Sequence, residues 1–125
     1  FVPPRGLFLL GYLDGAAAAC GGWRAHGEQD AEMKRMYVVP VARGLGLART
    51  MLAELEATAS AAGHTRMMLE TGMAQPEAIG LYTSSGYHAI EKYGMYRCEP
   101  GSRCYAKRLG ENRSESIGRL RLGRR

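Results

Sequence analysis

The sequence predicts one domain of the α/β class, in which a mixed, mostly antiparallel sheet is flanked by helices. Three observations lead to this class. The chain has 125 residues, of which 46% are apolar, and this composition supports a single buried core. Strand-like and helix-like segments follow one another in the order β-β-β-α-β-α-β-β. One central segment has its apolar residues at helical spacing.

The first third of the chain is predicted to form three strands. Residues 6–13, "GLFLLGYL", are an apolar run, and Asp14-Gly15 after them is a hairpin turn signal. Residues 16–24 return as the second strand, because the turn and Gly21-Gly22 outweigh the helix preference of four alanines. Residues 31–39 form the third strand, which Pro40 ends. Alternation divides the side chains of this strand into two faces, one with Glu32, Lys34, Met36 and Val38 and the other with Met33, Arg35 and Tyr37.

A strong amphipathic helix is predicted next. Its apolar residues stand three and four positions apart and form one stripe: Leu45, Ala48, Leu52, Leu55, Ala59 and Ala62. Gly63 is a C-terminal stop signal. A buried strand at residues 65–70 follows, and then a short helix at residues 76–85 with a proline in its first turn. Residues 87–93 and 102–109 are predicted as the last two strands.

The net charge of +5 is unevenly distributed along the chain. Residues 110–125 hold five arginines and two glutamates, so this segment supplies +3 of the total. We interpret residues 1–109 as the domain and residues 110–125 as a basic, flexible tail. The domain itself is mildly basic, which favours an anionic small ligand over nucleic acid as the partner. Exposed edge strands allow a homodimer.

Cysteine usage and hydropathy exclude several classes of protein. The three cysteines show no C-x-x-C spacing and the three histidines complete no ligand set, so no metal is expected. Such cysteines fit a reducing cytoplasm, which is the expected location. No apolar run reaches the ~20 residues of a membrane span, so no membrane partner is expected. The first residues, "FVPPRG", lack the basic region of a signal peptide.

The most informative stretch is "PVARGLGLARTML", residues 40–52, because two glycines stand where the helix must begin. A helix N-terminus carries unpaired amides and a partial positive charge, and glycines let phosphates approach those amides. Arg43 adds a planar fork of donors. The stretch lacks the lysine of a P-loop, and Arg49 stands where a Rossmann turn has its third glycine or alanine. A coenzyme A cradle and a glycine-rich helix start without a ligand both remain open.

Two separate motifs resemble the GCN5-related N-acetyltransferases (GNAT). The family signature Q/R-x-x-G-x-G/A is matched by "RGLGLA" at residues 43–48. A second family segment, approximately A-x-x-L-Y-x-x-x-G-F/Y, is matched by "AIGLYTSSGY" at residues 78–87. The motifs occur in the family's order, and the resemblance extends over residues 7–109. The resemblance implies a bacterial member, and we expect the strand and helices which precede the hairpin in its relatives to be missing from these 125 residues.

The resemblance implies an acetyl-CoA site between the strands at residues 31–39 and 65–70. The pantetheine arm would pair with the strand backbone, and the diphosphate would contact amides at the helix start, beside Arg43. Gln75 stands ahead of the second motif, where many relatives carry asparagine. The implied cofactor-binding residues are Met36, Tyr37, Val38, Arg43, Gly44, Leu45, Gly46, Leu47, Ala48 and Gln75.

The resemblance also implies catalytic residues. Tyr82 matches the family tyrosine that protonates the leaving thiolate. Glu32 lies six residues before Val38, which is the spacing of the glutamate base in histone-acetylating relatives. Glu70 is the substitute for this base, and a water chain without a single base is a third alternative.

We therefore expect an N-acetyltransferase that moves acetyl from acetyl-CoA to a primary amine, by direct transfer in a ternary complex. The acceptor would be an amine on a small molecule or a peptide. The alternative is a CoA-binding or degenerate GNAT-like module without efficient catalysis.

Overall fold

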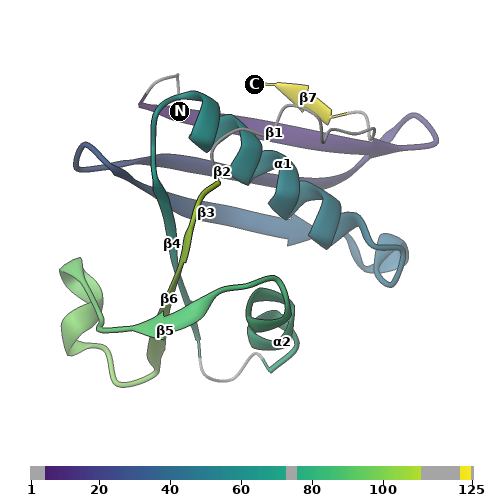
Figure 1. Cartoon of the computed structure of the whole chain (residues 1–125). Coiled ribbons are helices and arrows are strands. Elements are labelled where there is room, and N and C mark those ends of the chain that lie inside the picture. The colour runs from purple at the N-terminus through teal and green to yellow at the C-terminus, as the bar shows by residue number, and fades with distance from the viewer. Residues whose placement is uncertain (1–4, 73–75, 111–121, 125) are drawn as a thin grey trace.

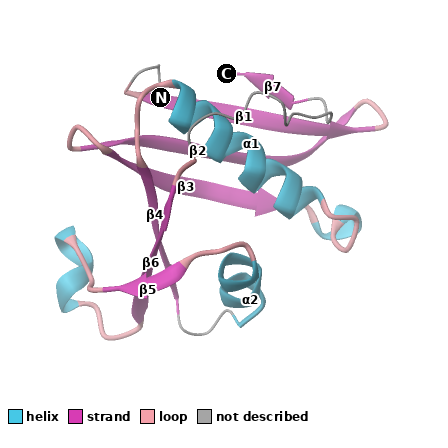
Figure 2. Ribbon diagram, viewed as in Figure 1, coloured by secondary structure: helices cyan, strands magenta, loops and turns pink. Residues whose placement is uncertain are grey.

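The computed structural model describes residues 5–72, 76–110 and 122–124. These residues form a seven-stranded sheet with helices packed on it (Figure 1, Figure 2). Along the chain, the elements are β1 (Gly6–Leu13), β2 (Ala16–His26), β3 (Asp30–Val38), η1 (Pro40–Ala42), α1 (Leu47–Ala61), β4 (Arg66–Gly72), α2 (Pro76–Ser84), β5 (His88–Ile90), η2 (Gly94–Cys98), β6 (Ser102–Arg108) and β7 (Leu122–Arg124). In this described part of the chain, none of the helices is long and apolar enough to cross a bilayer.

The sheet is mixed and mostly antiparallel, as predicted. Its strand order is β5-β6-β4-β3-β2-β1-β7. Among the described strands, only β3 and β4 pair in parallel, and every other neighbouring pair is antiparallel. A parallel pair needs a crossover connection, and α1 supplies it. Figure 1 shows α1 lying across β1, β2 and β3, whereas β4 and β6 run in a different direction.

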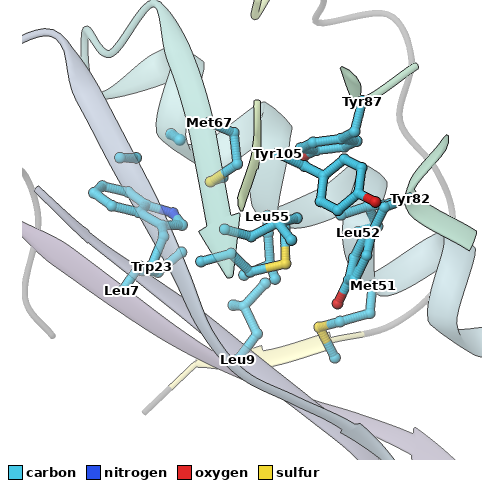
Figure 3. Packing of buried hydrophobic residues seen from close by; sticks show 14 of the residues in the cluster. Leu7, Leu9, Trp23, Met51, Leu52, Leu55, Met67, Tyr82, Tyr87 and Tyr105 are labelled. Atoms are coloured by element: carbon cyan, nitrogen blue, oxygen red, sulfur yellow. The ribbon is translucent and has the colours of Figure 1, made fainter. Parts of the chain in front are cut away.

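The core forms where α1 buries its apolar side against the sheet. Leu52, Leu55 and Ala59 are buried, as the predicted stripe requires, and Met51 joins them. Gly21 of β2 makes this approach close, because a Cβ atom there would lie 3.0 Å from Leu55 Cδ1. The packing partners come from β1, β2, β4, α2, β6 and the connection between α2 and β5, and they include Leu7, Leu9, Trp23, Met67, Tyr82, Tyr87 and Tyr105 (Figure 3).

The predicted apolar stripe is wrong at its first residue. Leu45 precedes the helix, and its side chain is 62% exposed. Gly46 takes a left-handed backbone conformation with φ 82° and serves as the N-cap, so helical geometry begins only at Leu47. Periodicity alone does not detect this, because an apolar residue just before a helix can have the same spacing as one inside it.

A β-bulge in β3 overturns the predicted division of its faces. Between the pairs Gly22↔Lys34 and Cys20↔Tyr37, one residue of β2 lies opposite two residues of β3. Arg35, one of those two residues, has φ 59°. The extra residue shifts the side-chain alternation by one position. Met33 and Met36 therefore both contact the core, and Glu32 does not share a face with Val38.

The last third of the chain differs most from the prediction. The strand expected at residues 87–93 is limited to the three residues of β5, and η2 forms in the connection to β6. Part of the predicted flexible tail forms a strand, because β7 pairs with β1 along the sheet edge. Backbone hydrogen bonds to an existing edge can hold so short a strand, and three residues give no detectable alternation.

Candidate active site

A cavity opens where the parallel strands β3 and β4 separate. The two strands are paired only at Asp30↔Arg66, Ala31↔Met67 and Glu32↔Met68. Beyond these pairs lies a cavity of about 260 Å³. Its lining residues come from β3, β4 and α2, and they are Met33, Lys34, Arg35, Met36, Leu69, Glu70, Thr71, Gly72, Ala78 and Tyr82. This opening lies between the two strands where the sequence predicts the site, which stays a prediction.

The edge of β3 presents backbone groups to this gap. The Val39 N–H donates to the Ala18 carbonyl oxygen of β2, at 2.8 Å. Successive amides of a strand point to opposite sides, so the Val38 N–H points away from β2 and toward the gap. Arg43 reaches the same edge, where its Nε donates to the Val38 carbonyl oxygen at 2.8 Å.

The glycine turn after β3 leaves room at the start of α1. Gly44 and Gly46 have φ 85° and 82°, and a Cβ atom on either would meet nothing within 4 Å. The first backbone bond of α1 runs from the Thr50 N–H to the Gly46 carbonyl oxygen, at 3.1 Å. The amides of Leu47 and Ala48 precede that bond, so helix geometry leaves them available to an external acceptor. The first turn contains no acidic residue.

Arg43 stands between this turn and the strand edge. Besides its bond to Val38, its guanidinium lies over the Tyr37 ring, 5.4 Å from the ring centroid. These contacts engage Nε and one face of the guanidinium, while the side chain stays exposed at the mouth of the turn. The structure thus brings the predicted residues of β3 and of the glycine turn together. Gln75, the remaining predicted contact, lies outside the described residues.

Tyr82 projects from α2 into the lining of the cavity and is 9% exposed. Burial raises the pKa of its phenol, so the hydroxyl stays protonated at neutral pH. The ring of Tyr87 contacts the Tyr82 ring in a T-shaped arrangement, with centroids 5.8 Å apart. Within the described part of the chain, the Tyr82 hydroxyl has no hydrogen-bond partner. A protonated hydroxyl at the cavity can donate a proton to a group that enters it.

The two candidate glutamates lie in different surroundings. Glu32 is 5% exposed and does not line the cavity. Its Oε2 accepts from the hydroxyls of Tyr93 and Tyr96, at 3.2 and 3.4 Å, and lies 3.3 Å from Lys34 Nζ. These aromatic partners are more than sixty positions away in sequence, so no local pattern could indicate them.

Glu70, by contrast, lines the cavity together with Tyr82. Its Oε2 accepts a hydrogen bond from Ser102 Oγ of β6, at 2.8 Å. The substitute candidate, and not Glu32, therefore lines the same cavity as the predicted acid. Sequence reasoning did not single out Ser102, which no motif marks.

A sheet that opens between two parallel strands, with a glycine-rich helix start at the opening, defines the acyl-CoA N-acyltransferase fold. Residues 1–87 match the sequence model of the acetyltransferase (GNAT) family. The chain belongs to this family. It is similar to an IAA acetyltransferase of Azospirillum brasilense, with 36% identity over 94 residues, which are 74% of this chain and 61% of that relative. The chain spans about three fifths of the length of the curated relatives it matches.

Solved structures agree with this assignment. The chain is similar to a Klebsiella pneumoniae protein described as an acyl-CoA N-acyltransferase, with 35% sequence identity and a TM-score of 0.81. That match covers 88% of this chain and 77% of the Klebsiella chain. A GNAT family acetyltransferase of Elizabethkingia anophelis, solved with acetyl-CoA bound, shares the fold at 14% identity and a TM-score of 0.74. That match covers 84% of this chain and 77% of the other.

We expect three phenols to resist ionisation in the folded protein. Burial raises the pKa of Tyr82; burial and the Glu56 carboxylate raise that of Tyr87; burial and the Glu32 carboxylate raise that of Tyr93. In an alkaline titration followed by phenolate absorbance, these three should stay protonated as the pH passes about 10. The unfolded chain releases these protons and the folded chain keeps them. The free energy of unfolding should therefore fall as the pH rises above about 10.

The same titration of the chain unfolded in urea is the control, and there the phenols should ionise together. Tyr93→Phe should remove one phenol from the late-ionising group. Ionisation of all seven tyrosines before any loss of far-ultraviolet circular dichroism would contradict the buried state of these three.

Proposed function

We propose that this chain transfers an acetyl group from acetyl-CoA to a primary amine, by direct transfer in a ternary complex. One observation carries the proposal: the cavity between β3 and β4 is lined by a buried, protonated tyrosine and by the edge of β3 as far as Met36, two residues before Val38. The chain's family and the acetyl-CoA bound to its structural relative support this reading.

The residues present fit acetyl-CoA. The open space around Gly44 and Gly46 admits a diphosphate close to the amides from Gly44 to Ala48. Arg43 keeps its terminal guanidinium nitrogens for the same phosphates. The edge of β3 from Met36 to Val38 supplies the strand-like partner that the amide groups of a pantetheine arm require. When bound, acetyl-CoA supplies the activated thioester.

The chemistry needs an electrophile, an acid and a base. The neutral amine nitrogen attacks the thioester carbonyl carbon, a C–N bond forms, and the C–S bond then breaks. The Val38 N–H is directed into the gap where the carbonyl oxygen gains charge, a contribution of about 3 kcal/mol in comparable sites. Tyr82 donates its proton to the departing sulfur. We assign removal of the amine proton to Glu70, because it shares the cavity with Tyr82 and Glu32 does not.

The acceptor class and the setting are also part of the proposal. The name of the A. brasilense relative supports a small-molecule acceptor, and a peptide amine is the other expected class.

The cysteines Cys20, Cys98 and Cys104 are free thiols, which supports a reducing cytoplasm. The short edge strand β5 supplies the surface for a homodimer.

The first prediction concerns the glycine turn. Calorimetric titration of acetyl-CoA into the full chain should give a dissociation constant in the micromolar range. Arg43→Ala should weaken binding about tenfold, because one charge-assisted contact to phosphate is lost. Arg103→Ala is the matched control, since Arg103 is an exposed arginine of β6, far from the turn in sequence, and it should bind like the parent. Equal affinities for all three proteins would contradict the assigned cradle.

Thiol release from acetyl-CoA in the presence of free amino acids, polyamines and short peptides tests transfer itself. Tight binding without amine-dependent thiol release from any of them would favour the CoA-binding module instead.

Replacing Tyr82 with phenylalanine should lower kcat about a hundredfold, because the leaving thiolate then departs without its proton donor. The KM for acetyl-CoA should change little, since the ring is kept. Steady-state kinetics with the best amine from the screen measures both constants. An unchanged kcat would remove the acid role of Tyr82.

A comparison of Glu70→Gln with Glu32→Gln separates the two candidate bases. Glu70→Gln should lower kcat/KM for the amine about a hundredfold. Glu32→Gln should keep kcat/KM and reduce stability instead, because the Glu32 carboxylate holds three polar side chains. The reverse pattern would assign the base to Glu32, and an unchanged kcat/KM in both variants would favour a water chain.

A further inference from the structure

A closed polar network lies beside Tyr82, on the side of the sheet that α1 covers. Glu56 of α1 accepts a hydrogen bond from the Tyr87 hydroxyl at 2.7 Å through Oε2. Its other carboxylate oxygen, Oε1, pairs with Lys107 Nζ of β6 at 2.9 Å. The same ammonium lies 5.7 Å from the centroid of the Tyr87 ring. Through these contacts, Glu56 joins α1 to β6 and to the connection that follows α2.

The tyrosine and the glutamate of this network are largely shielded from solvent. Tyr87 is 4% exposed, and the Glu56 side chain is 15% exposed. Burial and the Glu56 carboxylate raise the pKa of Tyr87 far above its ordinary value, so its hydroxyl remains a donor. Gly86, with φ 100°, leaves space for the lysine chain, since a Cβ there would lie 3.4 Å from Lys107 Cε. The Glu56 carboxylate therefore has both of its oxygens bonded within the protein, while the Lys107 side chain remains 31% exposed.

The network contacts Tyr82 through Tyr87. The two rings meet in a T-shaped contact, and the Tyr87 N–H donates to the Tyr82 carbonyl oxygen at 3.0 Å. Figure 3 shows Tyr82 and Tyr87 in one region of the core, together with Tyr105, Leu52 and Met51. The Tyr82 hydroxyl has no hydrogen bond to a described residue, so the position of this group must come from the neighbours of its ring. Tyr87 is one of these neighbours, and its own hydroxyl is held by a hydrogen bond to Glu56.

We propose that Glu56, Tyr87 and Lys107 are positioning residues for Tyr82. By anchoring the Tyr87 hydroxyl, Glu56 holds the Tyr87 ring in place, and this ring holds the Tyr82 hydroxyl at the cavity. The inference rests on the proposed acid role of Tyr82. A matched control exists on the same helix, because Glu54 has no hydrogen bond or ion pair with any described residue.

Carbon-13 NMR of the full chain, with ring-labelled tyrosine, tests the positioning directly. The Tyr82 signal is assigned by its loss in Tyr82→Phe. Tyr87→Phe keeps every ring carbon and removes only the anchored hydroxyl, so the fold should persist, as thermal unfolding would verify. The Tyr82 signal should broaden or shift in Tyr87→Phe and in Glu56→Gln, and stay unchanged in Glu54→Gln. An unchanged Tyr82 signal in both network variants would overturn the proposal.

Kinetics of a double-mutant cycle separate positioning from general stability. With acetyl-CoA and the best amine from the screen, Tyr87→Phe should lower kcat about tenfold while the KM for acetyl-CoA stays the same. Added to Tyr82→Phe, the same change should lower kcat no further, because the residue it positions is already gone.

Equal losses of kcat in both backgrounds would show that Tyr87 acts only on the fold, and the positioning role would fall while the acid role stands. If Tyr82→Phe itself leaves kcat unchanged, the acid role fails, and this inference fails with it. Each failure is therefore recognisable.

Discussion

The candidate site depends on one interrupted strand pairing. β3 and β4 are hydrogen-bonded over only three residue pairs, and then they separate. Had the pairing continued, the backbone groups of Met36 to Val38 would be satisfied within the sheet and no cavity would exist. The separation leaves an edge of β3 whose backbone groups can pair with another strand-like partner. A ligand with amide groups of its own can serve as that partner. The position of the break therefore sets where chemistry can occur.

Helix α1 connects this break to the core and to the glycine turn. Its apolar side, centred on Leu55, is packed on the strands, so the direction of its axis is fixed by burial. Its N-terminus must then lie at the end of β3, where Gly46 caps it. Arg43 joins the turn to the strand through the Val38 carbonyl oxygen. A helix held rigidly by the core presents its free amides at a defined place, which a flexible loop could not do.

Two polar networks flank the cavity from opposite faces of the sheet. One is centred on Glu32 and draws on η2, and the other is centred on Glu56 and draws on β6. In each network a buried or half-buried carboxylate is bonded to a lysine and to one or two tyrosine hydroxyls. Between them, Glu70 and Tyr82 remain at the cavity with few bonds of their own. Glu32, Glu56 and Glu70 are the same residue type, so only their surroundings distinguish them. Glu32 and Glu56 hold other side chains in place, whereas Glu70 is placed where it can react.

The sequence by itself determined the hairpin of β1 and β2, the helix α1, the glycine turn and the motif that contains Tyr82. These features depend on local periodicity, turn chemistry and short motifs, which neighbouring residues encode. Only the tertiary structure decided the bulge at Arg35, the partners of Glu32, the position of Glu70 and the strand β7. Each of these depends on residues far apart along the chain. A spacing of six residues could not place Glu32 beside Val38, because one extra residue in a strand moves the following side chains to the other face.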